Sequence, residues 1–292
     1  MEYKKIGIVT VLYKSETVLE DFFRTLNEQS YRNFTLYVVD NKSPDNSLDK
    51  SKEFAKSAWF KTKFIENNDN YGVAKGNNQG IGTALEDDCD YVLLSNNDVV
   101  LKPDTIEKLY LGLTENNADM AVPKIYFYGT SLIWMAGGKF TWYNGSTKHI
   151  GVNKKDKGQF DKCKKINYAP TCFMLIKKEI FEIVGMMDEK YFVYYDDADF
   201  VYRTMKKGQK FFYIYNSILE HKESTSTGVK SDFSIFYYIR NRIYFAKKHR
   251  RFFYFFYIEN ILYHYTIRWL KMINNRHQWK LMLRAMQEGA VL

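Results

Sequence analysis

Cysteine and proline are scarce in this chain of 292 residues, which contains three cysteines and four prolines. The cysteines, Cys89, Cys163 and Cys172, lie far apart, so neither a disulfide framework nor a pair with metal-ligand spacing is expected. We interpret them as reduced thiols in a reducing compartment. The apolar run at residues 6–13 is too short for a signal peptide and lacks a cleavage-like site. These features predict a cytoplasmic location.

Common nucleotide-binding and catalytic motifs are missing as well. Gly76, Gly80 and Gly82 do not follow the first predicted strand with G-x-G-x-x-G spacing, which excludes a dinucleotide fingerprint. The sequence has no Walker loop, no H-E-x-x-H pair and no Ser-His-Asp order. The chemistry must therefore come from other side chains.

Positive charge is concentrated near the C-terminus. The net charge is +9, and residues 231–292 alone hold eleven Lys and Arg residues against three acidic ones, a charge of +8. The first 230 residues are close to neutral, so any partner attracted by positive charge is expected at residues 231–292. Apolar residues make up 46% of the chain, which argues against global disorder.

Strands and helices alternate over the first hundred residues. Apolar and β-branched runs predict strands at 6–13, 34–40, 63–68 and 91–94, and helical periodicity predicts helices at 18–26, 47–58 and 73–86. This order predicts an α/β fold with a Rossmann-like, mostly parallel sheet flanked by helices. After residue 120, strands with Gly-containing turns predict an α+β half. We expect a catalytic domain at 1–230, with halves at about 1–120 and 121–230, and a helical tail at 231–292.

Polar loops follow three of the predicted strands. They begin at Asp40, Asn67 and Ser95, and all are rich in Asn and Asp. Ligands of doubly wound sheets bind outside the carboxyl ends of the strands, so these loops predict one site. In LLSNNDVV, residues 93–100, Asp98 is either a turn residue or a ligand of a hard cation. Mg²⁺ is often held by one or two carboxylates plus substrate phosphates.

A cluster of carboxylates follows the apolar run YFVYY. Asp196, Asp197 and Asp199 lie within four residues. A helix N-terminus favours negative charge and explains one or two of them. A general base tuned by apolar walls and neighbouring charge is the functional alternative, with Arg203 orienting a carboxylate. Further along, His221 is either a surface residue or a metal ligand, which Mn²⁺ accepts more readily than Mg²⁺.

Several motifs in sequence order carry a resemblance to a known family: IVTVLYKS, VVDNKSPDNS, NNDNYGVAKGNNQGI, LLSNNDV, YFVYYDDADFVYRTMKKG and EHKESTSTG. Over residues 5–250 the chain resembles the family-2 glycosyltransferases, which have the GT-A fold, and within them the bacterial rhamnosyltransferase-type enzymes of surface polysaccharides. The resemblance implies inverting transfer of a sugar from dTDP-rhamnose or a UDP-sugar to a glycan or lipid-linked glycan, with Mn²⁺ or Mg²⁺ as cofactor.

The resemblance also implies roles for single residues. Asp98 and His221 match the metal and diphosphate site, and Asp197 matches the catalytic base of a Glu-Asp pair whose first member is Asp196 here. The implied donor-binding residues are Thr10, Asp40, Asp69, Gly72, Lys75, Asn78, Asn96 and Asn97. The D-x-D element of the family reads Asn-Asn-Asp, so it has only one carboxylate.

The tail is basic and aromatic, with fifteen aromatic residues at 231–273. Five residues argue against a membrane span at 252–273: Glu259, Asn260, His264, Arg268 and Lys271. The last four recur as the polar stripe of an amphipathic helix. Such a helix either packs on the catalytic domain or docks on the anionic inner face of the cell membrane. No nucleic-acid-binding module is visible, and a homodimer is left open.

Two other functions remain open at this point. A sugar-phosphate nucleotidyltransferase also has a nucleotide-binding α/β sheet, but it needs a Gly-rich, basic loop where residues 11–17 read VLYKSET. A catalytically silent module that binds a membrane or a partner protein predicts no turnover and no metal-dependent nucleotide binding.

Overall fold

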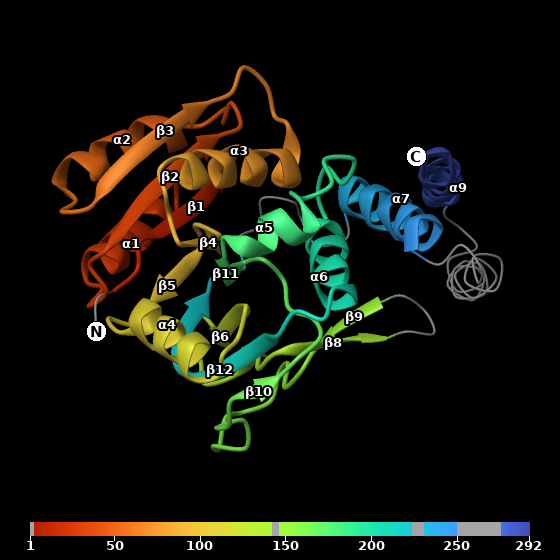
Figure 1. Ribbon diagram of the computed structural model, residues 1–292. Coiled ribbons are helices and arrows are strands. Elements are labelled where there is room, and N and C mark those ends of the chain that lie inside the picture. The colour runs from red at the N-terminus through yellow and green to blue at the C-terminus, as the bar shows by residue number, and fades with distance from the viewer. Residues whose placement is uncertain (1–2, 142–145, 224–230, 250–275) are drawn as a thin grey trace.

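A mostly parallel sheet forms the centre of the computed structural model, which describes residues 3–141, 146–223, 231–249 and 276–292 (Figure 1). The strands are β1 (Ile6–Leu12), β2 (Phe34–Asp40), β3 (Lys61–Glu66), β4 (Tyr91–Ser95), β5 (Val99–Leu101), β6 (Met120–Phe127), β7 (Ile133–Met135), β8 (Gly138–Thr141), β9 (Ser146–His149), β10 (Lys164–Lys165), β11 (Phe173–Lys177) and β12 (Phe211–His221). The helices are α1 (Leu19–Asn27), α2 (Ser47–Ser57), α3 (Gly72–Glu86), α4 (Thr105–Glu115), α5 (Glu179–Val184), α6 (Asp196–Lys206), α7 (Asp232–His249) and α9 (Arg276–Val291).

The strand order of the main sheet is β10-β12-β6-β11-β4-β1-β2-β3. β1 pairs in parallel with β2 and β4, and β2 pairs in parallel with β3. The predicted α/β class is confirmed, and helices flank the sheet as expected (Figure 1). The carboxyl ends of β1, β2 and β4 meet at one edge, which is where such sheets bind ligands.

Glycines in α3 let this helix lie close to β1. A Cβ atom at Gly80 would come within 2.3 Å of Val9, and one at Gly76 within 2.9 Å of Val11. Both distances are below van der Waals contact, so larger residues would push the helix away from the sheet. The glycines that interrupt the helical pattern in the sequence are therefore packing positions.

The second half departs from the simple alternation of the first. β11 inserts between β4 and β6 and runs antiparallel to both. β5, a strand of three residues that the sequence does not signal, pairs antiparallel with the end of β12. These pairings join segments more than fifty residues apart, and local patterns carry no information on such partners.

The described parts of the tail are helical. α7 and α9 pack against each other, and a Cβ atom at Gly289 of α9 would come within 2.3 Å of the carbonyl oxygen of Arg240 in α7. Lys248 and His249 of α7 also contact Asp199 of α6, so this part of the tail packs on the preceding domain. Membrane docking of the tail stays a prediction. The predicted polar stripe at 260–271 lies outside the described residues. Among the helices that are described, none combines the length and apolar character that a bilayer span requires.

Candidate active site

Asp98 and His221 meet at the carboxyl end of β4. The distance between Asp98 Oδ1 and His221 Nε2 is 3.1 Å, and both side chains are 8% exposed. Asp98 stands directly before β5, and Val99 of β5 is the register partner of His221 at the end of β12. The backbone amide of Lys222 also donates to the carbonyl of Asp98 over 2.8 Å. The short strand β5 thus brings together two residues that are far apart in the sequence.

This pair suits a divalent cation. At 3.1 Å, Asp98 Oδ1 and His221 Nε2 form a hydrogen bond, and the same separation fits two ligand atoms about 2.1 Å from one ion at a right angle, which are about 3 Å apart. The other ring nitrogen, His221 Nδ1, is buried without a hydrogen-bond partner in the described part of the chain, and an ion held by Nε2 would not satisfy it. No group of three or more His, Cys, Asp or Glu side chains that could hold a metal occurs among the described residues. Substrate phosphates would have to complete the shell.

The acidic pair Asp196 and Asp197 opens α6. Asp196 is 4% exposed, whereas Asp197 is partly exposed. Burial raises the pKa of both carboxyls, and repulsion from Asp197 raises the pKa of Asp196 further. The Tyr168 hydroxyl donates to Asp197 Oδ2 over 2.6 Å and the Ala198 amide to Oδ1 over 2.7 Å, and both bonds lower the pKa of Asp197. Asp197 is therefore the member that loses its proton first.

Aromatic rings connect the Asp98–His221 pair with the Asp196–Asp197 pair. The Trp134 ring lies between those of His221 and His149, with centroid distances of 4.6 and 4.5 Å. His149 in turn stacks on Tyr168, the partner of Asp197, at 6.3 Å. Burial lowers the pKa of His149 to about 4, so this imidazole is neutral at pH 7. The wall between the two carboxylates is therefore largely apolar.

Cys172 lies beside the loop that carries Asp98. Cys172 directly precedes β11, and its carbonyl oxygen accepts a hydrogen bond of 2.8 Å from the Asn96 amide. Burial raises the pKa of the Cys172 thiol, and the carboxylates of both Asp98 and Asp197 raise it further. Both carboxylates are thus within electrostatic reach of the same buried sulfur.

The end of β2 lies beside this edge of the sheet. Asp40 is 4% exposed, and burial raises its pKa even though its carboxylate accepts the Ser43 amide at 3.2 and 3.3 Å. The next residue, Asn41, donates to the carbonyl of Gly72 over 3.0 Å and accepts from Asn67 over 2.9 Å. Asn41 therefore ties the end of β2 to the start of α3.

The other implied donor-binding residues differ in access. Asp69 and Asn96 are exposed, and the Lys75 ammonium lies over the Tyr71 ring at 3.9 Å. Asn97 is 8% exposed and donates to the carbonyl of Val11 over 2.9 Å, so it holds the loop after β4.

Two further residues that the resemblance assigns to the donor are the half-buried Asn78 and the buried Thr10. Asn78 donates to the Met187 carbonyl at 2.9 Å and accepts the Met187 amide at 2.9 Å. Thr10 is 1% exposed within β1. Their assignment to the donor stays a prediction, and direct contact would require rearrangement of these side chains.

Asp199 and Arg203 form a separate anchor within α6. The Arg203 Nε atom lies 2.8 Å from Asp199 Oδ2, and Lys248 and His249 of α7 contact Asp199 Oδ1 at 2.8 and 2.6 Å. Burial alone would raise the pKa of Asp199, but the bond from His249 and the charges of Arg203 and Lys248 lower it to about 2. The carboxylate that Arg203 contacts is therefore that of Asp199. The same cluster of charged side chains joins α7 to α6.

The fold and the site define the class of protein. A crystal structure of GalNAc-T7 with UDP, GalNAc and Mn²⁺ superposes with a TM-score of 0.65 at 13% identity, over 84% of this chain and 48% of that chain. The protein therefore has the GT-A fold. The sequence model of glycosyl transferase family 2 matches residues 7–185, and the chain belongs to this family.

Two curated relatives are similar over most of the chain. Glycosyltransferase GlyG of Streptococcus pneumoniae serotype 4 is 24% identical over 234 residues, which are 79% of this chain and 74% of GlyG. The dTDP-rhamnosyl transferase RfbF of Shigella flexneri is 28% identical over 209 residues, which are 70% of this chain and 64% of RfbF. The chain thus spans less than two thirds of the length of RfbF.

Proposed function

We propose that the protein is an inverting glycosyltransferase that moves a sugar from dTDP-rhamnose or a UDP-sugar to a glycan or lipid-linked glycan acceptor. One observation carries the proposal. Ring contacts from His221 through Trp134 and His149 to Tyr168, which bonds Asp197, connect the Asp98–His221 pair with the Asp196–Asp197 pair at the ligand-binding edge of a GT-A sheet. The similarity to RfbF supports dTDP-rhamnose as the first donor to test.

The proposed reaction is a single displacement. Asp197 removes the proton of the acceptor hydroxyl, because burial raises its pKa towards the range in which a carboxylate is an effective base. The acceptor oxygen then bonds to the anomeric carbon while the bond from that carbon to the diphosphate oxygen breaks, which inverts configuration. Asp98 and His221 would hold Mn²⁺ or Mg²⁺, which neutralises charge on the diphosphate when bound.

A panel of donors tests the proposal. The protein is incubated with dTDP-rhamnose or UDP-sugars, lipid-linked glycan acceptors and Mn²⁺ or Mg²⁺, and release of nucleoside diphosphate is measured. We expect release from one donor class, together with a product of inverted anomeric configuration. In a parallel assay with added pyrophosphate and no acceptor, formation of nucleoside triphosphate and sugar 1-phosphate from the same donors would instead indicate a nucleotidyltransferase. No release from any donor would favour a silent binding module.

Removal of the Tyr168 hydroxyl should change the pH dependence. The hydrogen bond from Tyr168 stabilises the charged form of Asp197 and lowers its pKa, so Tyr168→Phe should raise that pKa. Since Asp197 acts deprotonated, the acidic limb of the kcat/KM profile should move to higher pH. Tyr213→Phe is the matched control, because it removes a buried hydroxyl that bonds to the Phe160 carbonyl instead. An unshifted acidic limb in Tyr168→Phe would contradict the role of this bond.

We also propose that residues 231–292 bind the anionic inner face of the cell membrane. α9 exposes three basic side chains, Arg276, Lys280 and Arg284, beside the exposed Leu283. Changing all three basic residues to Glu should abolish sedimentation with anionic liposomes.

The same charge change at a distant surface serves as the control. Lys154, Lys155 and Lys157 are exposed in the loop after β9. Their triple change to Glu should leave sedimentation intact. Equal loss in both triple variants would show that only net charge matters.

A further inference from the structure

The segment before the acidic pair has an unfavourable backbone conformation. Tyr194 and Tyr195 have φ angles of 64° and 65°, in the left-handed region that residues with a Cβ atom rarely adopt. They directly precede Asp196 and Asp197, so their conformation sets where both carboxylates lie. Two successive strained residues persist only where surrounding groups hold them.

Asn241 of α7 holds this segment. It is fully buried, and its amide nitrogen donates to the carbonyls of Val193 at 2.7 Å and Tyr194 at 2.9 Å. Its amide oxygen accepts from Arg240 Nε at 2.8 Å, which fixes the orientation in which the amide nitrogen faces the segment.

The same face of α7 packs against the Tyr195 ring. Tyr238 lies three residues before Asn241, and Phe245 lies four residues after it. The centroids of their rings are 5.4 and 5.6 Å from the centroid of the Tyr195 ring. Residues with this spacing share one side of a helix. Hydrogen bonds and ring contacts from one helix face therefore act on the same two strained residues.

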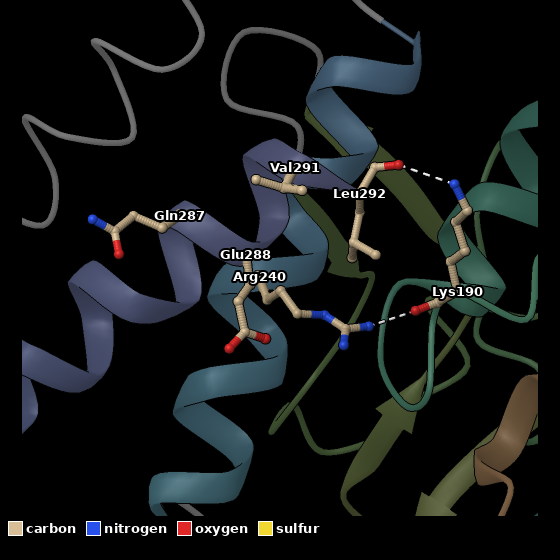
Figure 2. Close-up of a pocket in the computed structure, with 6 residues that line it drawn as sticks. All are labelled: Lys190, Arg240, Gln287, Glu288, Val291 and Leu292. Atoms are coloured by element: carbon tan, nitrogen blue, oxygen red, sulfur yellow. Dashed lines mark hydrogen bonds between the residues drawn. The ribbon is translucent and has the colours of Figure 1, made fainter.

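The opposite side of the segment is fixed to the donor-side helix α3. The Val73 amide donates to the Phe192 carbonyl over 2.7 Å, and a Cβ atom at Gly72 would come within 2.3 Å of that oxygen. At the start of the segment, Arg240 donates to the Lys190 carbonyl, and Lys190 Nζ donates to the Leu292 carbonyl over 2.9 Å (Figure 2). The segment is thus clamped between α3 and α7.

A cavity of about 520 Å³ lies beside this clamp, between α7, α9 and Lys190 (Figure 2). Its lining includes none of the candidate site residues. The hydrogen bonds of Asn241 to two backbone carbonyls are therefore a contact of α7 with the site that does not involve this cavity.

We infer that Asn241 is a positioning residue for the Asp196–Asp197 pair, and that α7 is a working part of the active centre. The inference rests on the proposed function. It also extends the site beyond residue 185, where the match to the family model ends. Asn241 touches the backbone that carries the base and acts through it. Its loss should therefore impair proton removal from the acceptor and leave donor binding largely intact.

The test compares variants on opposite faces of α7. Asn241→Ala removes both hydrogen bonds, and Asn241→Asp keeps the shape of the side chain but, once ionised, cannot donate. Ile243→Ala is the matched control, since Ile243 is 2% exposed and packs in the separate cluster with Ala285 of α9. Each variant is assayed for kcat, donor KM and Tm, and hydrogen exchange is followed in peptides covering residues 190–199.

Both Asn241 variants should lose roughly 10- to 100-fold in kcat, the cost expected for a misplaced catalytic group, with donor KM within about twofold. Residues 190–199 should exchange faster. Ile243→Ala should lower Tm but keep wild-type kcat and exchange in that segment. If Asn241→Ala does not fold, Asn241→Asp alone carries the comparison.

Two outcomes would overturn the inference. One is a kcat of the Asn241 variants that matches Ile243→Ala at similar Tm, and the other is unchanged exchange at 190–199. An inactive wild-type protein would instead reject the proposed function. The exchange measurement would still decide whether Asn241 holds the segment.

Discussion

Replacing Asp197 with asparagine is expected to lower kcat by about 10²- to 10⁴-fold, the range that a general base contributes. Asparagine has nearly the same shape but cannot take the acceptor proton, so donor affinity should stay close to that of the wild type. Turnover is measured as nucleoside diphosphate release, and donor binding by titration calorimetry. The Tyr168 hydroxyl can still bond to the amide oxygen, which should preserve the local structure.

Asp49→Asn provides the control for this change, because Asp49 is an exposed carboxylate in α2. It should leave kcat unchanged. Near-full activity of Asp197→Asn would show that Asp197 is not the base. Asp196 would then be the next residue to test, although its deeper burial and the repulsion from Asp197 raise its pKa and favour its protonated form.

Replacing Asp98 with alanine should weaken Mn²⁺-dependent donor binding by about 10- to 100-fold, since even partners outside the first coordination shell change metal affinity by that much. The variant removes the only carboxylate of the Asn-Asn-Asp element, and His221 alone is a poor site for a hard cation. Donor affinity is measured by titration with Mn²⁺ and again with EDTA.

The comparison with EDTA separates metal binding from general damage to the fold. With EDTA, the wild type and Asp98→Ala should bind the donor equally weakly. His221→Ala should show the same metal-dependent loss, and Asp49→Ala should show none. An unchanged affinity in Asp98→Ala with Mn²⁺ would return Asp98 to the role of a turn residue, the alternative that the sequence left open.

Local patterns predicted the first half of the fold well, because its strands and helices follow one another along the chain. Apolar runs located β1, β2 and β4, and α3 was predicted at 73–86 although glycines interrupt its helical pattern. β3 begins two residues before the predicted strand and ends at Glu66, because Asn67 leaves the strand to bond with Asn41 and Gln79. The hydrogen bonds of Asn67 are to residues far away in the sequence, so the local alternation of apolar and polar residues does not show where β3 ends.

The candidate site was predicted as a set of residues, and its internal connections were not. Polar residues at three strand ends indicated an edge of the sheet, and three crowded carboxylates indicated an unusual electrostatic environment. Tyr168, Trp134 and Asn241 escaped prediction, since a single Tyr, Trp or Asn in an apolar stretch looks like any packing residue. In the sequence Asn241 stands between Arg240 and Arg242, and nothing there indicates that it is buried.

By itself, the sequence determined the α/β class, the ligand-binding edge and the residue types that supply carboxylate and imidazole. These follow from short-range periodicity and from the rule that parallel strands end at one edge. Only the tertiary structure decided that Asp98 faces His221, that Tyr168 bonds Asp197, and that Asn241 of α7 bonds the segment before the acidic pair. Each of these depends on pairing between distant segments, β5 with β12 or α7 with the segment before α6. Such partners are chosen by burial and packing of the whole chain, which no local pattern contains.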